Sequence, residues 1–366
     1  MRKFLYSMII MLGFVFLYHT EPASVWGAPY ESEGGWEDET TDPWEEKADF
    51  SNAALSQTTF SYTVFKQCAW DSTTGEFVGE IIILNAINPE YLSEDEYSYS
   101  VEQAGIKLTD LWITGDVIHF TAEGMGSAKV NLIIQGKVFP FTIQASLIQL
   151  KGNSSLLLKK GKIKKLSLSG TTGKVSWKSS NSKIVSVSSS GKVKAKKEGN
   201  VVITAHVNGG KIGCVISVVT AKRYRAIKEA IKIGKTCKYS QAKRMKKGYY
   251  DCSAAVWKAY KKAGMVFGSK YYAPTAADNA KWCVKHKKKV KGNVVTNTFK
   301  MKYTVGSLFY SVGMTKGRYK KIGHVEMLAG YEFIGFDESG KACVSPVWAI
   351  NNGYIGKDGL VCDPLK

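Results

Sequence analysis

The chain has 366 residues, which is longer than one ordinary domain and predicts two or three. Hydrophobic residues make up 44% of it, enough for real cores, so a wholly disordered protein is excluded. The formal net charge of +20 is unevenly divided: residues 1–150 hold 7 Lys/Arg and 21 Asp/Glu, whereas residues 151–366 hold 44 and 10. Such a basic half either suits a polyanionic partner or simply keeps a lysine-rich surface soluble.

Residues 1–27 are predicted to be a secretory signal peptide. A basic start at Arg2 and Lys3 precedes an apolar run over 4–18 and small residues around 23–28. The run of 15 residues is short for a bilayer span of about 20, so we favour cleavage over an uncleaved anchor. The mature protein is expected to be secreted, extracellular or cell-wall associated, with no stable membrane insertion.

Export also limits the classes of molecule that the protein is expected to bind. Nucleic acid is not expected outside the cell, so peptidoglycan and anionic wall polymers are the predicted partners of the basic half. No cysteine or histidine pairing has metal-ligand spacing, so neither a metal nor another cofactor is expected. An odd number of cysteines leaves at least one thiol without an intrachain partner. The seven cysteines are Cys68, Cys214, Cys237, Cys252, Cys283, Cys343 and Cys362.

Residues 28–58 are predicted to be an acidic flexible linker, because they are rich in Glu, Asp and Gly and show no periodicity. Alternating apolar residues then predict short strands over 59–150 and again over 151–220. Gly-x-Val occurs at 115–117 and at 191–193, followed each time by Glu-Gly, a strand, a glycine turn and another strand. This internal repeat predicts two related Ig-like β-sandwiches in tandem.

The second of these segments carries a family resemblance. Residues 175–209, "VSWKSSNSKIVSVSSSGKVKAKKEGNVVITAHVNG", resemble the bacterial Ig-like group 2 (BIG2) module, including Trp177, the turn at Asn181, Gly191 and the turn at Gly199. The first segment resembles that family only in its second half. The resemblance implies either a spacer or an adhesive domain on a surface protein, and we favour the spacer.

From Ala221 the pattern changes to that of an α+β domain over 221–366. Tyr224, Ile227 and Ile231 follow a helical stripe, and a second helix is predicted from Cys252 to about residue 263. Helices followed by a run of strands are typical of the α+β class. The predicted strands are 308–310, 324–329, 331–336 and 342–348.

Cys252 is the predicted nucleophile. Asp251 is a good N-cap residue, which makes Cys252 the first residue of a helix, where the helix dipole favours a thiolate. The alternative is a buried structural cysteine. His324 opens an alternating segment that would fix an imidazole at the start of a strand, whereas His286 lies among lysines. A cysteine peptidase needs a thiolate beside an imidazole, and Cys252 and His324 meet that need if the fold brings them together.

The same region resembles the NlpC/P60 family of cell-wall cysteine peptidases. "DCSAAVWKAYKKAG" resembles the family's nucleophile helix, "CKYSQ" its upstream tyrosine, "YAPTAADNAKWC" its Arg-Thr segment, "YTVGSLFYSV" its Gly-Asp-Leu strand and "GHVEMLAG" its histidine strand. The resemblance implies a papain-like fold and cleavage of an amide next to a D-glutamyl residue of the peptidoglycan stem peptide. The residues that it implies are Cys252 and His324 for catalysis and Tyr239, Asp251 and Ser253 for substrate binding.

The sequence departs from the family at three positions: Ala254 replaces Gly, Ser307 replaces Asp, and Pro274 stands where Arg is frequent. These departures leave the substrate detail open. The family's third polar residue, which orients the imidazole, usually follows the histidine by about a dozen positions, where this chain has an inserted hairpin. Asn351 or Asn352 can fill the role, unless they only form an Asn-Asn-Gly turn; we assign Asn351.

The sequence therefore predicts a multidomain protein, with one or two Ig-like β-sandwiches followed by an α+β papain-like domain. The predicted function is a secreted peptidoglycan hydrolase, a cysteine endopeptidase that acts through Cys252 and His324. Two alternatives stay open. One is a cell-surface adhesin or wall-binding protein whose papain-like domain is not catalytic, and the other is a cell-wall amidase.

Overall fold

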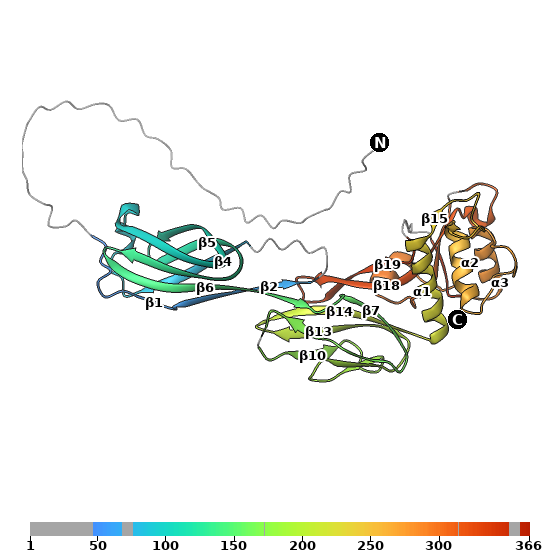
Figure 1. Cartoon of the computed structure of the whole chain (residues 1–366), viewed down its shortest axis with the longest axis horizontal. Helices are drawn as coiled ribbons and strands as arrows, with labels where there is room; N and C mark the ends of the chain where they lie inside the picture. The colour runs from blue at the N-terminus through green and yellow to red at the C-terminus, as the bar shows by residue number, and fades with distance from the viewer. Residues whose placement is uncertain (1–46, 68–75, 172, 314, 351–358) are drawn as a thin grey trace, which may run out of the picture. The chain divides into compact units, whose positions relative to one another are not determined.

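Seven strands of the N-terminal part form one hydrogen-bonded sheet (Figure 1). The computed structural model describes residues 47–67, 76–171, 173–313, 315–350 and 359–366, so the predicted signal segment and most of the predicted linker lie outside the described residues. The strands are β1 (Ala54–Leu55), β2 (Thr59–Lys66), β3 (Phe77–Leu84), β4 (Tyr97–Thr114), β5 (Val117–Ile134), β6 (Lys137–Leu150) and β9 (Leu168–Ser169). Short 3-10 turns, η1 (Pro89–Tyr91) and η2 (Glu94–Glu96), connect β3 to β4.

A bend in the β4–β5 hairpin lets this single sheet enclose its own core. One edge of β5 pairs with β4 along its length, while the other edge pairs first with β3 and then with β6. The bend falls between these two neighbours, at Gly105 and Gly124, whose φ angles are +91° and +99°. A Cβ atom on Gly124 would lie 2.3 Å from the carbonyl oxygen of Gly105, so only glycine permits this close approach. One face of the sheet is buried, as in β3, where alternate residues are buried.

The next strands form a two-sheet sandwich. One sheet has the order β10-β13-β14-β7 and the other β11-β12-β8. Val193 and Ala195 point into the core between the sheets, while the alternate residues of β12 are exposed. The strands are β7 (Ser155–Lys159), β8 (Ile163–Lys165), β10 (Ser176–Ser179), β11 (Val185–Val187), β12 (Lys192–Ala195), β13 (Gly199–Val207) and β14 (Gly210–Val219).

Strand β14 is buried on both faces. Cys214, Ile216 and Val218 belong to the core of the sandwich, whereas Val215 and Val219 belong to the core of the C-terminal region. Successive side chains of a strand point to opposite faces, so one strand contributes to two cores. The near-continuous apolar run of this strand reflects the absence of a solvent-facing side.

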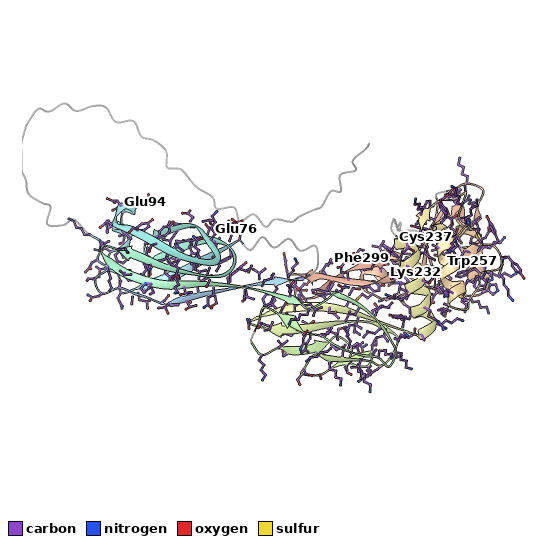
Figure 2. The ribbon with its side chains drawn as sticks, viewed as in Figure 1. Glu76, Glu94, Lys232, Cys237, Trp257 and Phe299 are labelled. Atoms are coloured by element: carbon purple, nitrogen blue, oxygen red, sulfur yellow. The ribbon has the colours of Figure 1, made fainter. Side chains whose placement is uncertain are left out.

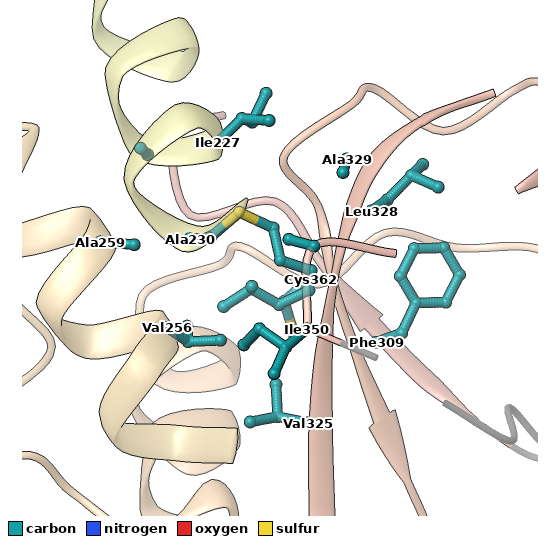
Figure 3. Packing of buried hydrophobic residues seen from close by; sticks show 14 of the residues in the cluster. Ile227, Ala230, Val256, Ala259, Phe309, Val325, Leu328, Ala329, Ile350 and Cys362 are labelled. Atoms are coloured by element: carbon teal, nitrogen blue, oxygen red, sulfur yellow. The ribbon is translucent and has the colours of Figure 1, made fainter. Parts of the chain in front are cut away.

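The C-terminal region combines helices with a four-stranded antiparallel sheet of order β19-β18-β17-β20. Figure 3 shows Ile227 and Ala230 of α1 and Val256 and Ala259 of α2 in the core between the helices and the sheet, with Val256 near Val325. The helices are α1 (Ala221–Thr236), α2 (Cys252–Lys262), α3 (Ala276–Lys285), α4 (Val294–Phe299) and the 3-10 turn η3 (Tyr319–Lys321). The strands are β15 (Lys238–Tyr239), β16 (Tyr249–Tyr250), β17 (Leu308–Ser311), β18 (His324–Phe336), β19 (Ala342–Trp348) and β20 (Leu360–Cys362).

Two features of this region differ from the sequence prediction. The strands predicted at 324–329 and 331–336 are one continuous strand, β18, which passes Gly330 with a bulge instead of ending there. Helices α3 and α4 were not predicted. Their N-caps are Thr275 and Asn293, each of which accepts a hydrogen bond from a backbone N–H of the first turn. Among the described residues, no helix is both long and apolar enough to cross a membrane.

A buried ion pair joins the start of α1 to the end of the chain. Arg223 donates to both carboxylate oxygens of Asp363, at 2.7 and 3.1 Å, and its Nε lies 3.4 Å from Glu198. The Arg223 side chain is only 4% exposed, so its charge depends on these carboxylates. The pair therefore ties α1 to the segment that follows β20.

Candidate functional site

The N-terminus of α2 presents Cys252. The helix begins at Cys252 with Asp251 as its N-cap, as the sequence predicted. The Asp251 carboxylate accepts hydrogen bonds from the Ala254 N–H at 2.7 Å and from the Ser253 hydroxyl at 3.1 Å. The cap fixes the first turn of the helix, and the rest of α2 is held by buried residues such as Val256. Cys252 is therefore rigidly placed at the positive end of the helix dipole.

His324 meets Cys252 from the neighbouring sheet. It is the first residue of β18 and pairs with Ser311 of β17, while α2 packs on β18. Cys252 is the largest influence on the pKa of His324, so the thiol and the imidazole are neighbours. The fold thus brings together the two residues whose sequence context predicts a catalytic role. His286, in contrast, is exposed and stacks on Trp282, with 4.0 Å between the ring centroids.

Glu326 supplies a carboxylate behind the imidazole. Its Oε1 lies 3.0 Å from Nε2 of His324, and the side chain is 1% exposed. Residues two apart on a strand share a face, so the His-Val-Glu order of β18 places Glu326 beside His324. Glu326 was not predicted from the sequence, although the alternation of β18 carried the signal. Asn351, which was predicted to orient the imidazole, lies outside the described residues.

The electrostatics of the site favour a charged imidazole. Hydrogen bonds to Cys252 and to Glu326 raise the pKa of His324 to about 10, and they outweigh the opposing effect of burial. Burial raises the pKa of Glu326, while its hydrogen bond to His324 lowers it in part. An imidazolium beside a thiol favours the thiolate. The arrangement therefore places a thiol next to a protonated imidazole, a proton donor, at neutral pH.

Two tyrosines lie beside the thiol. Tyr239 is 55% exposed and meets Tyr250 edge to face, with ring centroids 5.6 Å apart. Burial raises the pKa of Tyr239, and the nearby Cys252 adds to the rise. Tyr239 is thus close to the thiol and open to solvent. The polar side-chain atoms of Asp251 and Ser253, the other two residues assigned to substrate binding, take part in the cap of α2, and both residues are buried.

Arg244 contacts Asp251, the residue that caps α2. Its Nη1 lies 3.1 Å from the Asp251 carboxylate, and its Nη2 donates to the carbonyl oxygens of Ala273 and Pro274 at 2.7 and 2.9 Å. The guanidinium also lies 5.5 Å from the ring centroid of Tyr272. Arg244 thereby joins the loop before α3 to the residue that caps α2. Its role was not predicted, since it stands in a run of lysines with no local signal that distinguishes it.

Comparison with known proteins identifies one module. Residues 148–215 match the family model of the bacterial Ig-like domain (group 2), which confirms the group 2 prediction for the sandwich. No NlpC/P60 family model matches the chain. No curated protein matches its sequence.

Several solved structures have weak similarity to the chain. Invasin, a bacterial integrin-binding protein, has 13% identity and a TM-score of 0.32, covering 46% of this chain and 39% of its own. A C-terminal intimin fragment in complex with the intimin-binding domain of its translocated receptor has 14% identity and a TM-score of 0.32, covering 80% and 98%. Domains 4 and 5 of the S-layer protein SbsC have 21% identity and a TM-score of 0.18, covering 35% and 79%. The chain spans well under half of the invasin structure, and TM-scores this low carry no conclusion about its function.

Proposed function

We propose that residues 221–366 form a cysteine hydrolase that cleaves amide bonds in the peptidoglycan stem peptide. The observation that carries the proposal is the juxtaposition of Cys252, at a helix start, with His324, at a strand start, whose imidazole lies 3.0 Å from the Glu326 carboxylate. A thiol, a base in contact with it and a third group that orients the base are the parts that nucleophilic acyl transfer requires.

In the proposed mechanism, the Cys252 thiolate attacks the amide carbonyl carbon. Asp251 already accepts hydrogen bonds from the backbone N–H groups of Ala254 and Ala255. The N–H groups of Cys252 and Ser253, which have no acceptor within the helix, stabilise the oxyanion. His324 protonates the departing amine, and a thioester to Cys252 forms. His324 then takes a proton from the water that hydrolyses the thioester, which releases the acid and restores the thiolate and the imidazolium.

Glu326 acts through His324 in this scheme. Its carboxylate holds the ring so that the other nitrogen meets Cys252, and it stabilises the imidazolium before and during proton transfer. The charge is retained at a site that is 1% exposed because the imidazolium compensates it. Glu326 is therefore a positioning residue, and Cys252 and His324 are the catalytic residues.

Three observations support the cell wall as the place where the protein acts. The motifs around Cys252 and His324 resemble those of cell-wall peptidases, and the sandwich matches a bacterial Ig-like model. The segment 1–27 has the pattern of an export signal. Together they support a secreted or wall-associated protein in which the sandwich acts as a spacer beside the hydrolase.

Digestion of purified peptidoglycan tests the proposal. The chain without residues 1–27, its Cys252→Ala variant and a Cys237→Ala control are incubated with walls, and released fragments are identified by mass spectrometry. Cys237 is a half-buried thiol close to the site, so its loss removes a cysteine without removing the nucleophile. Stem-peptide fragments from the parent and the control, but not from Cys252→Ala, are expected. Release of muramyl sugar freed from L-Ala would instead identify an amidase.

A non-catalytic wall-binding protein or adhesin is the second candidate, and the group 2 Ig-like match favours it. The same experiment separates the two. If the parent and Cys252→Ala bind walls equally and neither releases a fragment from several wall types, binding is the function and the hydrolase proposal fails.

A further inference from the structure

Helix α1 carries a line of unpaired positive charge on its outer face. Its inner face is buried through residues such as Ala226 and Ile233. The basic stripe consists of Arg225, Lys228, Lys232 and Lys235, which are all exposed. Their spacing of three, four and three residues places them in a row along one side of a helix.

The stripe is not explained by the stability of the helix. Like charges three and four residues apart destabilise a helix, and Lys228 and Lys232 are such a pair. Among the described residues, none of the four cations forms an ion pair with a carboxylate. A row of mutually repelling cations without partners within the described chain is suited to an external anion.

The stripe borders a groove of about 600 Å³. Lys159 of β7 and Lys262 at the end of α2 add two further cations to its lining, while Glu229 is the one carboxylate that the described residues place there. Figure 2 shows Lys232, one of the lining cations, on α1. Six cations against one carboxylate give the groove a strongly positive potential, which a concave surface concentrates.

The groove lacks the features by which single-stranded nucleic acids and lipid surfaces bind. Stacking of nucleic-acid bases needs an open aromatic face, but the ring of Tyr224 is covered by Lys159, whose Nζ lies 5.1 Å from the ring centroid. Attachment to a lipid surface needs exposed apolar side chains that enter the membrane. None of the exposed large hydrophobic residues of the described chain lies on α1.

We propose that the basic stripe, with Lys159 and Lys262, binds a linear polyol-phosphate polymer of the bacterial envelope. The cations rise along α1 in steps of about 4.5–6 Å, so a flexible phosphodiester chain lying along the helix meets them in succession. Recognition is by charge and by the linear arrangement. The stripe is distinct from the thiol site, because no hydrogen bond or ion pair among the described residues joins it to Cys252, His324 or Glu326.

The test compares two variants that lose the same charge. In the stripe variant, Arg225→Gln, Lys228→Gln, Lys232→Gln and Lys235→Gln are combined. In the control variant, four exposed lysines of the sandwich are replaced in the same way. They are Lys164, Lys178, Lys192 and Lys194. Binding of lipid-free poly(glycerol phosphate) is measured by calorimetry over a series of salt concentrations.

The parent and the control variant should bind the polymer with similar affinity and similar salt dependence. The stripe variant should lose roughly tenfold or more in affinity. Its slope of log affinity against log salt should fall by about 2–3, because each neutralised phosphate contributes about 0.7 to that slope. An equal loss in the control variant would overturn the proposal, since total charge would then explain the binding. Equally tight binding of duplex DNA, polyglutamate or anionic vesicles would overturn the assigned ligand class.

Folding and the thiol site are followed in the same samples. Circular dichroism and the unfolding midpoint must match those of the parent, and Lys232→Glu alone replaces the stripe variant if the fourfold change unfolds the chain. Alkylation of Cys252 and cleavage of soluble muropeptides should be unchanged in the stripe variant. The binding result therefore stands whether or not the hydrolase proposal succeeds.

Discussion

Nε2 of His324 and Oε1 of Glu326 lie 3.0 Å apart, two residues from each other on one strand. The relationship makes the imidazole and its carboxylate a local unit of β18, so their geometry does not depend on the packing of a separate loop. Cys252 comes from a distant segment, and the docking of α2 on the sheet brings it to His324. Variants of Glu326 test the contact within β18, and variants of His324 test the contact with Cys252 on α2.

Glu326→Gln should move the alkaline limit of activity. The pKa of His324 is raised to about 10, so the imidazolium persists through neutral pH and is lost as the pH rises through that value. Without the carboxylate, the His324 pKa falls, and the alkaline limb should shift down by about one unit or more. The maximal rate should fall by about 10- to 100-fold. The pH profile of muropeptide cleavage measures both, and an unshifted limb would show that Glu326 does not act on His324.

His324→Ala should slow alkylation of Cys252. The imidazolium favours the thiolate, and a thiol without it is mostly protonated near neutral pH. At about pH 6.5 the rate with iodoacetamide should fall at least about tenfold, because an ordinary thiol is then about 1% ionised. His286→Ala is the matched control, since His286 is exposed and stacks on Trp282, away from the thiol. Equal rates in the two variants would contradict a thiolate–imidazolium pair.

Arg223→Ala should destabilise the protein by about 3–5 kcal/mol, because the Asp363 carboxylate would stay buried without its partner. Urea unfolding measures the free energy. Replacing both partners, as in Arg223→Met with Asp363→Leu, should recover most of the loss, since no unpaired charge then remains between these two positions. If the double variant is no better than the single one, the ion pair contributes more than charge compensation.

Gly124→Ala should cost more than Gly136→Ala in the N-terminal sheet. Both glycines have positive φ, which costs about 1–2 kcal/mol for another residue. A Cβ atom at Gly124 also meets a carbonyl oxygen at 2.3 Å, whereas nothing lies within 4 Å at Gly136. Thermal unfolding of both variants gives the comparison. Equal midpoints would mean that the hairpin bend relaxes at little cost.

The order of adjacent residues predicted those parts of the site that depend only on close neighbours in the sequence. The Asp-Cys order placed the cap and the first residue of α2, because a capping side chain acts within one helical turn. The His-Val-Glu order held the same kind of information about Glu326. The prediction instead placed the third residue at Asn351, beyond the hairpin that follows His324, and not on the strand of His324 itself.

Long-range packing set the limits of the sequence prediction. An isolated glycine suggests a break, yet Gly330 lies inside β18, because pairing with β19 continues on both sides of it. The run of apolar residues in β14 indicates a strand buried on both faces, but only the folded chain shows that its second face packs in the core of the C-terminal region. Arg244 contacts residues 273 and 274, about thirty positions away, so its bracing role needs the folded loop.

Because strand β14 is buried on both faces, it limits where the chain can be divided into stable fragments. Val215 and Val219 lie in the core that also holds α1 and α2. A fragment that begins at Ala221 would therefore expose an apolar strip of the C-terminal region to water, and it should aggregate or unfold readily. Work on the isolated C-terminal region needs a fragment that starts near residue 148 and keeps the sandwich attached. In that sense the Ig-like module is a structural half of the C-terminal region.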